Sequence, residues 1–298
     1  MEYKIDCVIV TYNRLSLLQE CINSVLGQTY NINTIFVVDN NSTDGTRKYL
    51  DSLTHKISKV KSITLKRNLG GAGGFNVGLK SFINNSDADY VWIMDDDTVP
   101  NKDALEKLVH KIPLVKKLGF LSSNVRWRDG SIAKMNVPTT SPDWNALSNY
   151  GIIKLKTASF VSLLFSRNMI ENIGYPIAPF FIWGDDIEYT FRSYAAGYNN
   201  YFVSSSMVEH KIKNNTSTNI FMESNPNRIN RYYFDSRNRM YISRKYYGKK
   251  NQLKLIINQG IIQPVKLMLS HSPFKFKKAG IVFKGTFSGI TFNPKVEK

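Results

Sequence analysis

Only two cysteines, Cys7 and Cys21, occur in the 298 residues, so the chain can build neither a disulfide framework nor a cysteine metal cluster. There is also no run of 18 uncharged apolar residues, so we expect no transmembrane helix. The first residues are charged and lead directly into an apolar stretch, which does not match a secretory signal peptide. These absences predict a protein of the reducing cytoplasm with two buried thiols.

Acidic side chains are scarce relative to basic ones. The sequence holds 40 Lys and Arg against 23 Asp and Glu, which gives a net charge of +17. Such an excess predicts an anionic partner and leaves nucleic acid, a phosphorylated substrate and an acidic membrane surface open. A hydrophobic content of 42% with 12% aromatic residues argues against a disordered chain. The length suits one large domain, or one domain with an appendage.

Apolar runs alternate with amphipathic segments through the N-terminal third of the chain. We expect strands at residues 7–10, 34–38, 62–65 and 90–94, and helices at residues 15–26, 46–53 and 75–83. Continuous apolar strands that alternate with helices predict a parallel sheet covered on both faces. Ligands bind beyond the carboxyl ends of such strands, and polar residues follow each of these four: residues 11–13, 39–40, 67–68 and 95–97.

The pattern changes in the middle of the chain. We expect a helix at residues 102–117, strands of a mixed sheet at residues 120–127 and 158–165, and a hairpin turn at Asp129 and Gly130. A helix at residues 186–196 is closed by Gly197. Basic helical segments follow at residues 227–247 and 251–270, and Pro264 is expected to interrupt the second.

Three adjacent carboxylates, Asp95, Asp96 and Asp97, follow the fourth apolar run. Carboxylates at the end of a buried strand repel one another and are costly to desolvate, so they require a cation. A divalent metal that carries a phosphorylated ligand is the simplest candidate, and an acidic surface turn is the alternative. His210 is a candidate for an additional ligand of such a site, although a lone histidine is more often structural.

Two further segments indicate binding or catalysis. Four glycines within residues 70–74 separate a strand from a helix, which predicts either close approach to an anionic ligand or a tight turn. Asp185 and Asp186 open a helix and serve either as a cap or as a general base. Trp183 precedes them and offers a flat surface on which a sugar ring can stack.

Residues 8–14, 28–29 and 37–46, the glycine segment and residues 92–100 are together similar to family 2 glycosyltransferases with the GT-A fold. They resemble the subgroup that contains bacterial galactofuranosyltransferases, with rhamnosyltransferases close by, and the similarity covers residues 4–247. The resemblance implies an α/β fold, with a Rossmann-like, mostly parallel central sheet flanked by helices and a basic helical appendage at the C-terminus. We therefore expect a catalytic domain at residues 1–215 and a helical region at residues 216–298.

The resemblance also implies roles for single residues. Asp95, Asp97 and His210 match ligands of Mn²⁺ or Mg²⁺, and Asp186, with Asp185 beside it, matches the catalytic base. Trp183 is the expected acceptor- or sugar-binding residue, but Gly184 separates it from the acidic pair, whereas galactofuranosyl polymerases have the tryptophan directly adjacent. The positions expected to bind the nucleotide sugar are Thr11, Asn13, Arg14, Asp39, Arg67, Asn68, Gly73, Asp95 and Asp96.

The implied activity is inverting, metal-dependent transfer of galactofuranose from UDP-galactofuranose to a polyprenyl-diphosphate-linked glycan acceptor. The setting would be bacterial surface polysaccharide synthesis, as of capsule, O-antigen or cell wall. A rhamnosyltransferase that uses dTDP-rhamnose is the alternative. A sugar nucleotidyltransferase is more distant, because it would normally carry a glycine-rich basic loop where this chain has residues 11–14. We expect no nucleic-acid partner, because an acidic rim repels phosphate backbones.

The basic C-terminal segment has two interpretations. Its helices pack on the catalytic domain or on a second subunit, which would make a homo-oligomer. Alternatively, they form a surface that lies on anionic lipid close to the acceptor. The second interpretation predicts a cytoplasmic protein that is peripheral on the inner face of the cell membrane.

Overall fold

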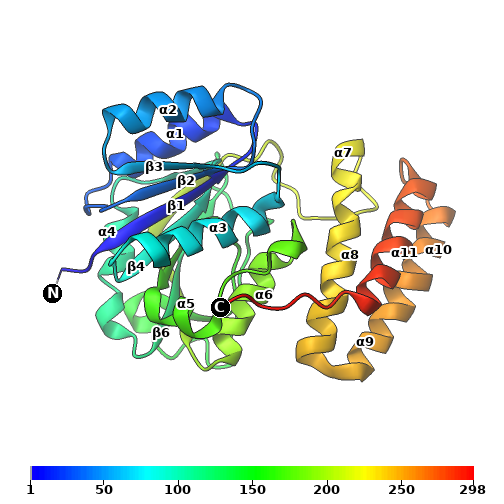
Figure 1. Cartoon of the computed structure of the whole chain (residues 1–298). Coiled ribbons are helices and arrows are strands. Elements are labelled where there is room, and N and C mark those ends of the chain that lie inside the picture. The colour runs from blue at the N-terminus through cyan, green and yellow to red at the C-terminus, as the bar shows by residue number, and fades with distance from the viewer. Residues whose placement is uncertain (1) are drawn as a thin grey trace.

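A mixed β-sheet with helices on both faces forms the centre of the protein in the computed structural model, which describes residues 2–298 (Figure 1). The strands within these residues are β1 (Ile5–Thr11), β2 (Ile35–Asp39), β3 (Val60–Thr64), β4 (Tyr90–Asp95), β5 (Thr98–Pro100), β6 (Leu118–Arg126), β7 (Thr139–Thr140), β8 (Ile152–Thr157), β9 (Leu163–Ser166) and β10 (Asn199–His210). Their order is β3-β2-β1-β4-β9-β6-β10-β8-β7, and β5 pairs with β10.

The helices of the sheet region are α1 (Leu15–Leu26), α2 (Thr46–Lys56), α3 (Gly70–Asn85), α4 (Ala104–Val109), α5 (Arg167–Ile173) and α6 (Asp185–Ala195). The C-terminal helices are α7 (Pro226–Ile229), α8 (Arg231–Ile242), α9 (Gly248–Ile257), α10 (Gln263–Leu269) and α11 (Lys275–Thr291). Two π-helical turns, Ser243–Tyr247 and Asn258–Ile262, join α8 to α9 and α9 to α10.

The parallel half of the sheet confirms the prediction for the N-terminal third. Strands β3, β2, β1 and β4 are parallel, and in their register Thr11 lies opposite Asp39 while Val10 lies opposite Asp95. Because parallel strands end at the same edge, the polar residues that follow them meet there. This edge is where the candidate site lies.

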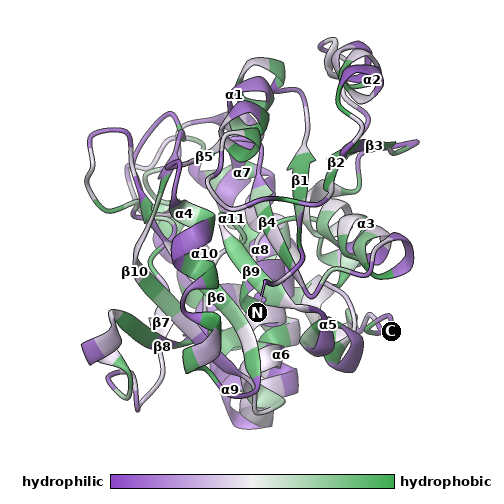
Figure 2. Cartoon of the chain, turned by 90° about the vertical axis from the view of Figure 1, so that its left-hand side faces the viewer, coloured by the Kyte–Doolittle hydropathy of each residue, from purple (hydrophilic) through white to green (hydrophobic). Residues whose placement is uncertain are grey.

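Two apolar layers cover the sheet. Side chains from α1, α2 and α4 pack on one face with Cys7 and Ile9, and side chains from α3, α5 and α6 pack on the other with Val8 and Val10. The alternation along β1 follows from the period of two in a strand. Figure 2 shows the result as hydrophobic central strands beneath helices of mixed hydropathy. Cys7 and Cys21 are buried free thiols, as expected.

The C-terminal half of the sheet carries His210 to the carboxylate edge. Strand β9 is antiparallel between β4 and β6, and β10 is parallel to β6. The short strand β5 follows Asp97 directly and pairs antiparallel with the end of β10, with Thr98 opposite His210. The end of β10 thereby lies beside the acidic triplet, although His210 is 113 residues from Asp97 in sequence.

Several predicted element boundaries were wrong. The helix expected at residues 102–117 ends at Val109, and only a short 3₁₀ turn, Ile112–Leu114, follows, because Pro113 cannot continue a helix. In the expected strand at residues 158–165, only the part from Leu163 onward pairs. The interruption expected at Pro264 is confirmed: a π-helical turn directly before it separates α9 from α10, and Pro264 lies in the first turn of α10.

The glycine segment is also different from the prediction. It is not a loop but the first turns of α3. A Cβ atom on Gly74 would lie 2.4 Å from Cγ1 of Val10, and one on Gly70, which has φ +72°, would lie 1.9 Å from the carbonyl oxygen of Phe181. Both glycines are therefore required for the close packing of α3 against β1 and against the loop before α6.

The C-terminal helices lie beside the sheet region, and the final residues return to it (Figure 1). Helix α11 packs along α8, and the backbone of Glu297 accepts a hydrogen bond from the N–H of Tyr175 at 2.9 Å. Within residues 2–298, each helix is either too short or too polar to cross a membrane.

Candidate active site

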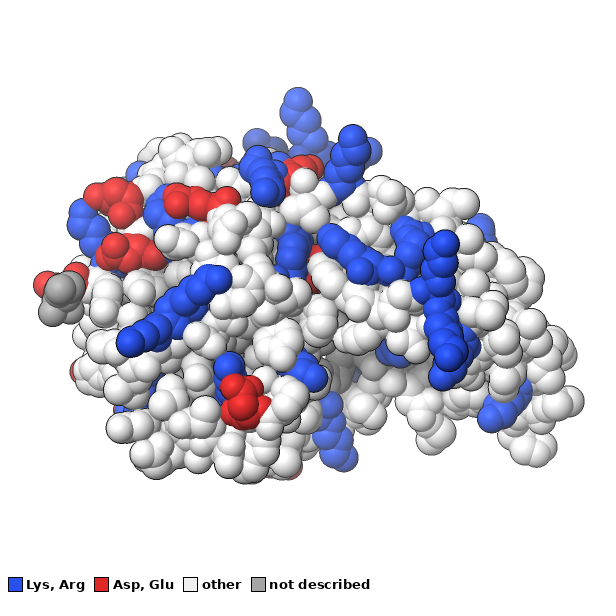
Figure 3. All heavy atoms as spheres, turned by 90° about the horizontal axis from the view of Figure 1, so that it is seen from below, with Lys and Arg blue, Asp and Glu red and all other residues white. Residues whose placement is uncertain are grey.

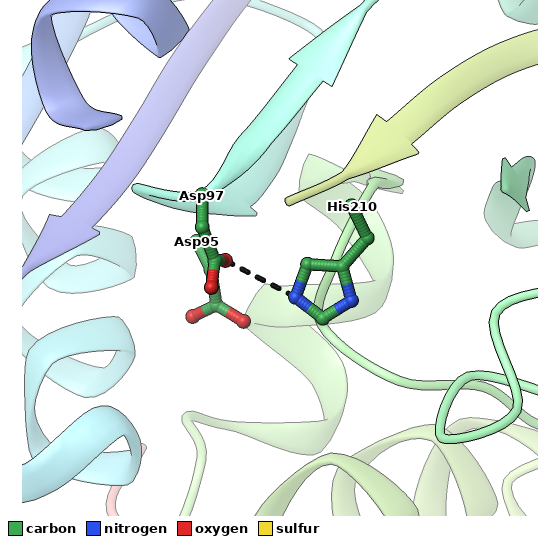
Figure 4. A group of neighbouring side chains, drawn as sticks. All are labelled: Asp95, Asp97 and His210. Atoms are coloured by element: carbon green, nitrogen blue, oxygen red, sulfur yellow. Dashed lines mark hydrogen bonds and ion pairs between the residues drawn. The ribbon is translucent and has the colours of Figure 1, made fainter. Parts of the chain in front are cut away.

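Asp95, Asp97 and His210 form a cluster at the carboxyl edge of the sheet (Figure 4). Asp95 is the last residue of β4, Asp97 directly precedes β5, and His210 is the last residue of β10. One ligand atom from each lies within 4.8 Å of the others, and Nε2 of His210 is 3.1 Å from Oδ1 of Asp97. The structure thus brings together the three residues predicted to hold a metal.

The chemistry of the cluster fits a divalent cation. Nδ1 of His210 is hydrogen-bonded to Oδ1 of Asn136 at 2.8 Å, which orients the ring so that Nε2 faces the carboxylates. Carboxylate oxygens suit both Mn²⁺ and Mg²⁺, and the imidazole nitrogen suits a transition-metal ion such as Mn²⁺ better than the harder Mg²⁺. Burial and repulsion from Asp97 and Asp96 raise the pKa of Asp95 well above its ordinary value. A bound cation would remove this penalty.

Arg14 supplies part of the compensating charge in the structure. Its guanidinium donates to Oδ1 of Asp96 at 3.2 Å and also pairs with Asp97. Burial acts to raise the pKa of Asp97, but the hydrogen bond from His210 and the charges of His210 and Arg14 lower it to about 2. Asp97 is therefore ionised and available to a cation throughout the physiological range.

Asp96 faces a different way from its neighbours. It accepts hydrogen bonds from the Thr11 hydroxyl at 2.8 Å and from the Tyr12 N–H at 3.3 Å, and only 4% of its surface is exposed. Burial raises its pKa to about 6. Among the described residues, those that line the large cleft include Asp95 and Asp97 but not Asp96. The middle carboxylate ties the turn after β4 to the end of β1.

A second acidic pair opens α6. Asp185 and Asp186 follow Gly184, whose φ of +84° turns the chain into the helix. Burial and the charge of Asp186 raise the pKa of Asp185 to about 8. Burial raises the pKa of Asp186 to about 6, with a hydrogen bond from the Ile187 N–H opposing it. Trp183 precedes the pair in sequence and is half-buried. Its ring lies edge-on to that of Tyr232, with 4.9 Å between the ring centroids.

One cleft of about 1450 Å³ contains both acidic groups. Its lining includes Asp95, Asp97 and His210 on one side and Trp183, Asp185 and Asp186 on another, together with residues of α8 and α9. The C-terminal helices therefore form a wall of the candidate site.

Of the residues predicted to bind a nucleotide, Arg14 and Asp95 line this cleft, and all but Gly73 lie at or just after the ends of β1, β2, β3 and β4. Asn13 joins two of the loops, since its Oδ1 accepts from the Thr43 N–H at 2.7 Å. Asp39 is fully buried, and its Oδ2 has no hydrogen-bond partner among the described residues. Asn68 accepts from the Gly70 N–H at 2.7 Å, and Arg67 is exposed.

Gly73 was expected near the nucleotide, but it is buried inside α3, where a Cβ atom would lie 2.4 Å from Cβ of Leu69. Gly71 lines the cleft instead. The pattern of glycines did not distinguish the two positions, because the helix begins earlier than expected.

Asn238 is a site residue that the sequence did not reveal. It is fully buried in α8, and its Nδ2 donates to the carbonyls of Phe180, Ile182 and Trp183 at 3.0, 3.3 and 2.7 Å. Phe181 and Trp183 have φ values of +66° and +62°, which are strained for side chains other than glycine. Asn238 thus holds the loop that carries Trp183 and leads to Asp185. No local motif signals such a long-range contact.

Comparison with known proteins identifies the class. Residues 6–161 match the sequence model of the family Glycosyl transferase family 2, which is more than half of the chain. The chain belongs to this family, and it has the GT-A fold.

Its relatives are distant. Glycosyltransferase AglE of Haloferax volcanii is 26% identical over 200 residues, which cover 65% of this chain and 62% of AglE. Poly-beta-1,6-N-acetyl-D-glucosamine synthase of Staphylococcus epidermidis is 27% identical over 179 residues, which cover 57% of this chain and 41% of the synthase. The chain thus matches less than two thirds of the length of either relative.

Solved structures share the fold at low identity. The structure of GalNAc-T7 with UDP, GalNAc and Mn²⁺ has a TM-score of 0.61 at 17% identity, covering 86% of this chain and 55% of that one. The mannosyltransferase PcManGT of Pyrobaculum calidifontis with GDP-Man and Mn²⁺ has a TM-score of 0.59 at 15% identity, and the match covers 95% of this chain and 74% of that one. S. aureus TarS 1-349 has a TM-score of 0.59 at 18% identity, and the match covers 90% of this chain and 76% of that one.

Proposed function

We propose that this glycosyltransferase moves a sugar from a nucleotide-sugar donor to a hydroxyl group of an acceptor by an inverting single displacement. The observation that carries the proposal is the pairing, in one cleft, of a cluster fit for a divalent cation with a separate acidic pair. A displacement needs both, because the leaving diphosphate develops negative charge while the attacking hydroxyl must lose a proton.

The residues divide this work. Asp95, Asp97 and His210 would hold Mn²⁺ or Mg²⁺, which when bound offsets the charge of the departing nucleoside diphosphate. Asp186 accepts the proton of the acceptor hydroxyl. At the same time the hydroxyl oxygen bonds to the anomeric carbon of the donor sugar, and the bond from that carbon to the diphosphate oxygen breaks. Its pKa of about 6 suits a base that is ionised near neutral pH. Asp185 is protonated there and serves as a hydrogen-bond donor.

The unpaired oxygen of Asp39 favours a nucleotide-binding position at the end of β2. A buried carboxylate oxygen without a partner is costly, and an N–H group of a base or a ribose hydroxyl would satisfy it. Thr11 lies opposite Asp39 in the register, so both groups belong to one corner of the site.

UDP-galactofuranose is our first candidate donor, and dTDP-rhamnose is the second. The N-acetyl-D-glucosamine polymer for which the synthase relative is named and the GDP-Man bound by PcManGT add a nucleotide-activated N-acetylglucosamine and GDP-mannose to the panel worth testing. The full-length enzyme would be incubated with each donor, acceptor lipid, and Mn²⁺ or Mg²⁺, and mass spectrometry would detect released nucleotide and extended acceptor. Metal-dependent turnover of one donor is expected; absence of turnover with every donor would contradict the proposal.

For the acceptor we propose a polyprenyl-diphosphate-linked glycan, as in synthesis of a surface polysaccharide, with residues 216–298 as the acceptor- and membrane-facing region. Residues 243–298 hold twelve Lys and Arg and one acidic residue, Glu297. Large exposed apolar side chains are frequent in the same segment, among them Leu269 at 80% and Phe276 at 70%. Basic and apolar side chains together favour an anionic lipid surface.

A further inference from the structure

Five arginines line the cleft that holds the metal-fitting cluster, and the charges of two of them act on a third. Arg14 lies at the start of α1, Arg228 lies in α7, and Arg231 is the first residue of α8, and all three line the cleft. Two of them have acidic partners. Arg14 pairs with Asp96 and Asp97, and Nε of Arg228 lies 3.3 Å from Oε2 of Glu223.

Arg231 differs from the other two. Its side chain is half-buried, and within residues 2–298 it makes neither a hydrogen bond nor an ion pair. Burial and repulsion from Arg14 and Arg228 lower its pKa, and Glu223 opposes this only in part. A guanidinium that is partly desolvated, repelled by two like charges and without a partner is unfavourable unless an anion binds there.

The position of Arg231 identifies the kind of anion. Arg14, the neighbour that repels it most, contacts Asp97 of the metal-fitting cluster. A group that bridges that cluster and Arg231 must carry several negative oxygens. The planar fork of arginine suits two oxygens of one phosphate.

We propose that Arg231 binds a diphosphate group in the cleft next to Asp95, Asp97 and His210. This inference rests on the proposed function, because it assigns a residue to the diphosphate that the transfer reaction releases. The C-terminal helices then complete the reaction site as well as covering it. Two ligands carry such a diphosphate group: the nucleotide-sugar donor and a lipid-linked acceptor.

The test uses the full-length protein with Arg231→Gln and Arg231→Lys, and Arg47→Gln as the matched control. Arg47 is exposed near the start of α2 and lies outside the cleft lining. Calorimetry with Mn²⁺ would measure the affinities for inorganic pyrophosphate, UDP, uridine and farnesyl diphosphate. Melting temperatures would check that each variant is folded.

Arg231→Gln should weaken pyrophosphate binding about tenfold or more, Arg231→Lys should weaken it less, and Arg47→Gln should not change it. An equal loss for UDP, with unchanged uridine affinity, identifies the donor as the source. A loss for pyrophosphate and farnesyl diphosphate, with unchanged UDP affinity, identifies the acceptor. Unchanged affinity of a folded Arg231→Gln for all three diphosphates would overturn the proposal. Wild-type protein that turns over no donor would instead count against the proposed function.

Discussion

Asp185 and Asp186 are neighbours in sequence but lie in different electrostatic surroundings. Asp185 is 7% exposed, and burial and the charge of Asp186 raise its pKa. Asp186 is more open, and the charge that acts on it from α8 is that of Asp235. The pair therefore offers one protonated and one ionised carboxyl group near neutral pH, with pKa values of about 8 and about 6.

The two residues should respond differently to the same substitution. Asp186→Asn removes the ionised base and should lower kcat about 100-fold or more while leaving donor affinity nearly intact. Asp185→Asn resembles the protonated acid already present and should cost far less. Steady-state kinetics with donor binding measured in parallel distinguishes them; equal losses in the two variants would contradict the assignment of roles.

The pKa of Asp186 also predicts the acid limb of the pH profile. A general base must be ionised, so activity should be present above pH 6 and should fall about tenfold per unit below it. The measurement is kcat/KM from pH 5 to 8 at saturating metal. A profile that rises toward low pH would show that a protonated group, and not an ionised Asp186, limits the reaction.

Metal binding should be visible without turnover. Mn²⁺ should raise the melting temperature of the wild type by several degrees, because a ligand of the native state stabilises it. Asp97→Asn should abolish most of this rise, since Asp97 is a ligand candidate. Asp87→Asn is the matched control, because Asp87 is exposed and, among residues 2–298, forms an ion pair with Lys4 alone. A full Mn²⁺ response in Asp97→Asn would exclude the cluster as the binding site.

At the scale of elements, the loop before α6 depends on a helix more than 50 residues later. Three carbonyl groups of the loop accept from the single amide of Asn238. The carbonyl of Phe180 also accepts from the Ile182 N–H and from Arg237, so Asn238→Ala removes the donor mainly from the part-buried carbonyls of Ile182 and Trp183. We expect the free energy of unfolding to fall by about 2–3 kcal/mol and kcat to fall as Trp183 and Asp186 lose their position. Asn85→Ala, at the exposed end of α3, is the control. Chemical denaturation and kinetics measure both effects.

The same loop shows which parts of the site the sequence could predict. The sequence could predict Asp95, Asp97, His210 and Asp186 as site candidates, because apolar strands, a turn and a helix start have local patterns. The structure brings the first three together, and the roles of all four stay predictions. Asn238 and Arg231 were not found as site residues, because their roles depend on how α8 packs against an element distant in sequence. Likewise, the glycines of α3 resemble those of a ligand loop, and only the proximity of Val10 shows that they serve packing.

For the whole molecule, charge is distributed unevenly between the sheet region and the C-terminal helices. In Figure 3, acidic side chains lie over the sheet region, and the lobe of C-terminal helices shows basic and uncharged atoms only on that face. Helix α9 combines exposed Lys249, Lys250 and Lys254 with Leu253 and Ile257, which are 58% and 44% exposed. This is the composition of a surface that lies on anionic lipid.

Replacing Lys249, Lys250 and Lys254 with Gln should therefore weaken binding to vesicles that contain anionic lipid. Each lysine near such a surface contributes about 1 kcal/mol, so the triple variant should bind about 100-fold more weakly. The matched control replaces Lys48, Lys56 and Lys61, which are exposed on α2 and β3 and change the net charge equally. Co-sedimentation with phosphatidylglycerol vesicles, and with phosphatidylcholine vesicles for comparison, measures the effect. If both triple variants lose affinity alike, net charge and not the α9 surface governs the attachment. If neither does, these helices serve another purpose, and sedimentation velocity would then test whether they join two copies of the chain.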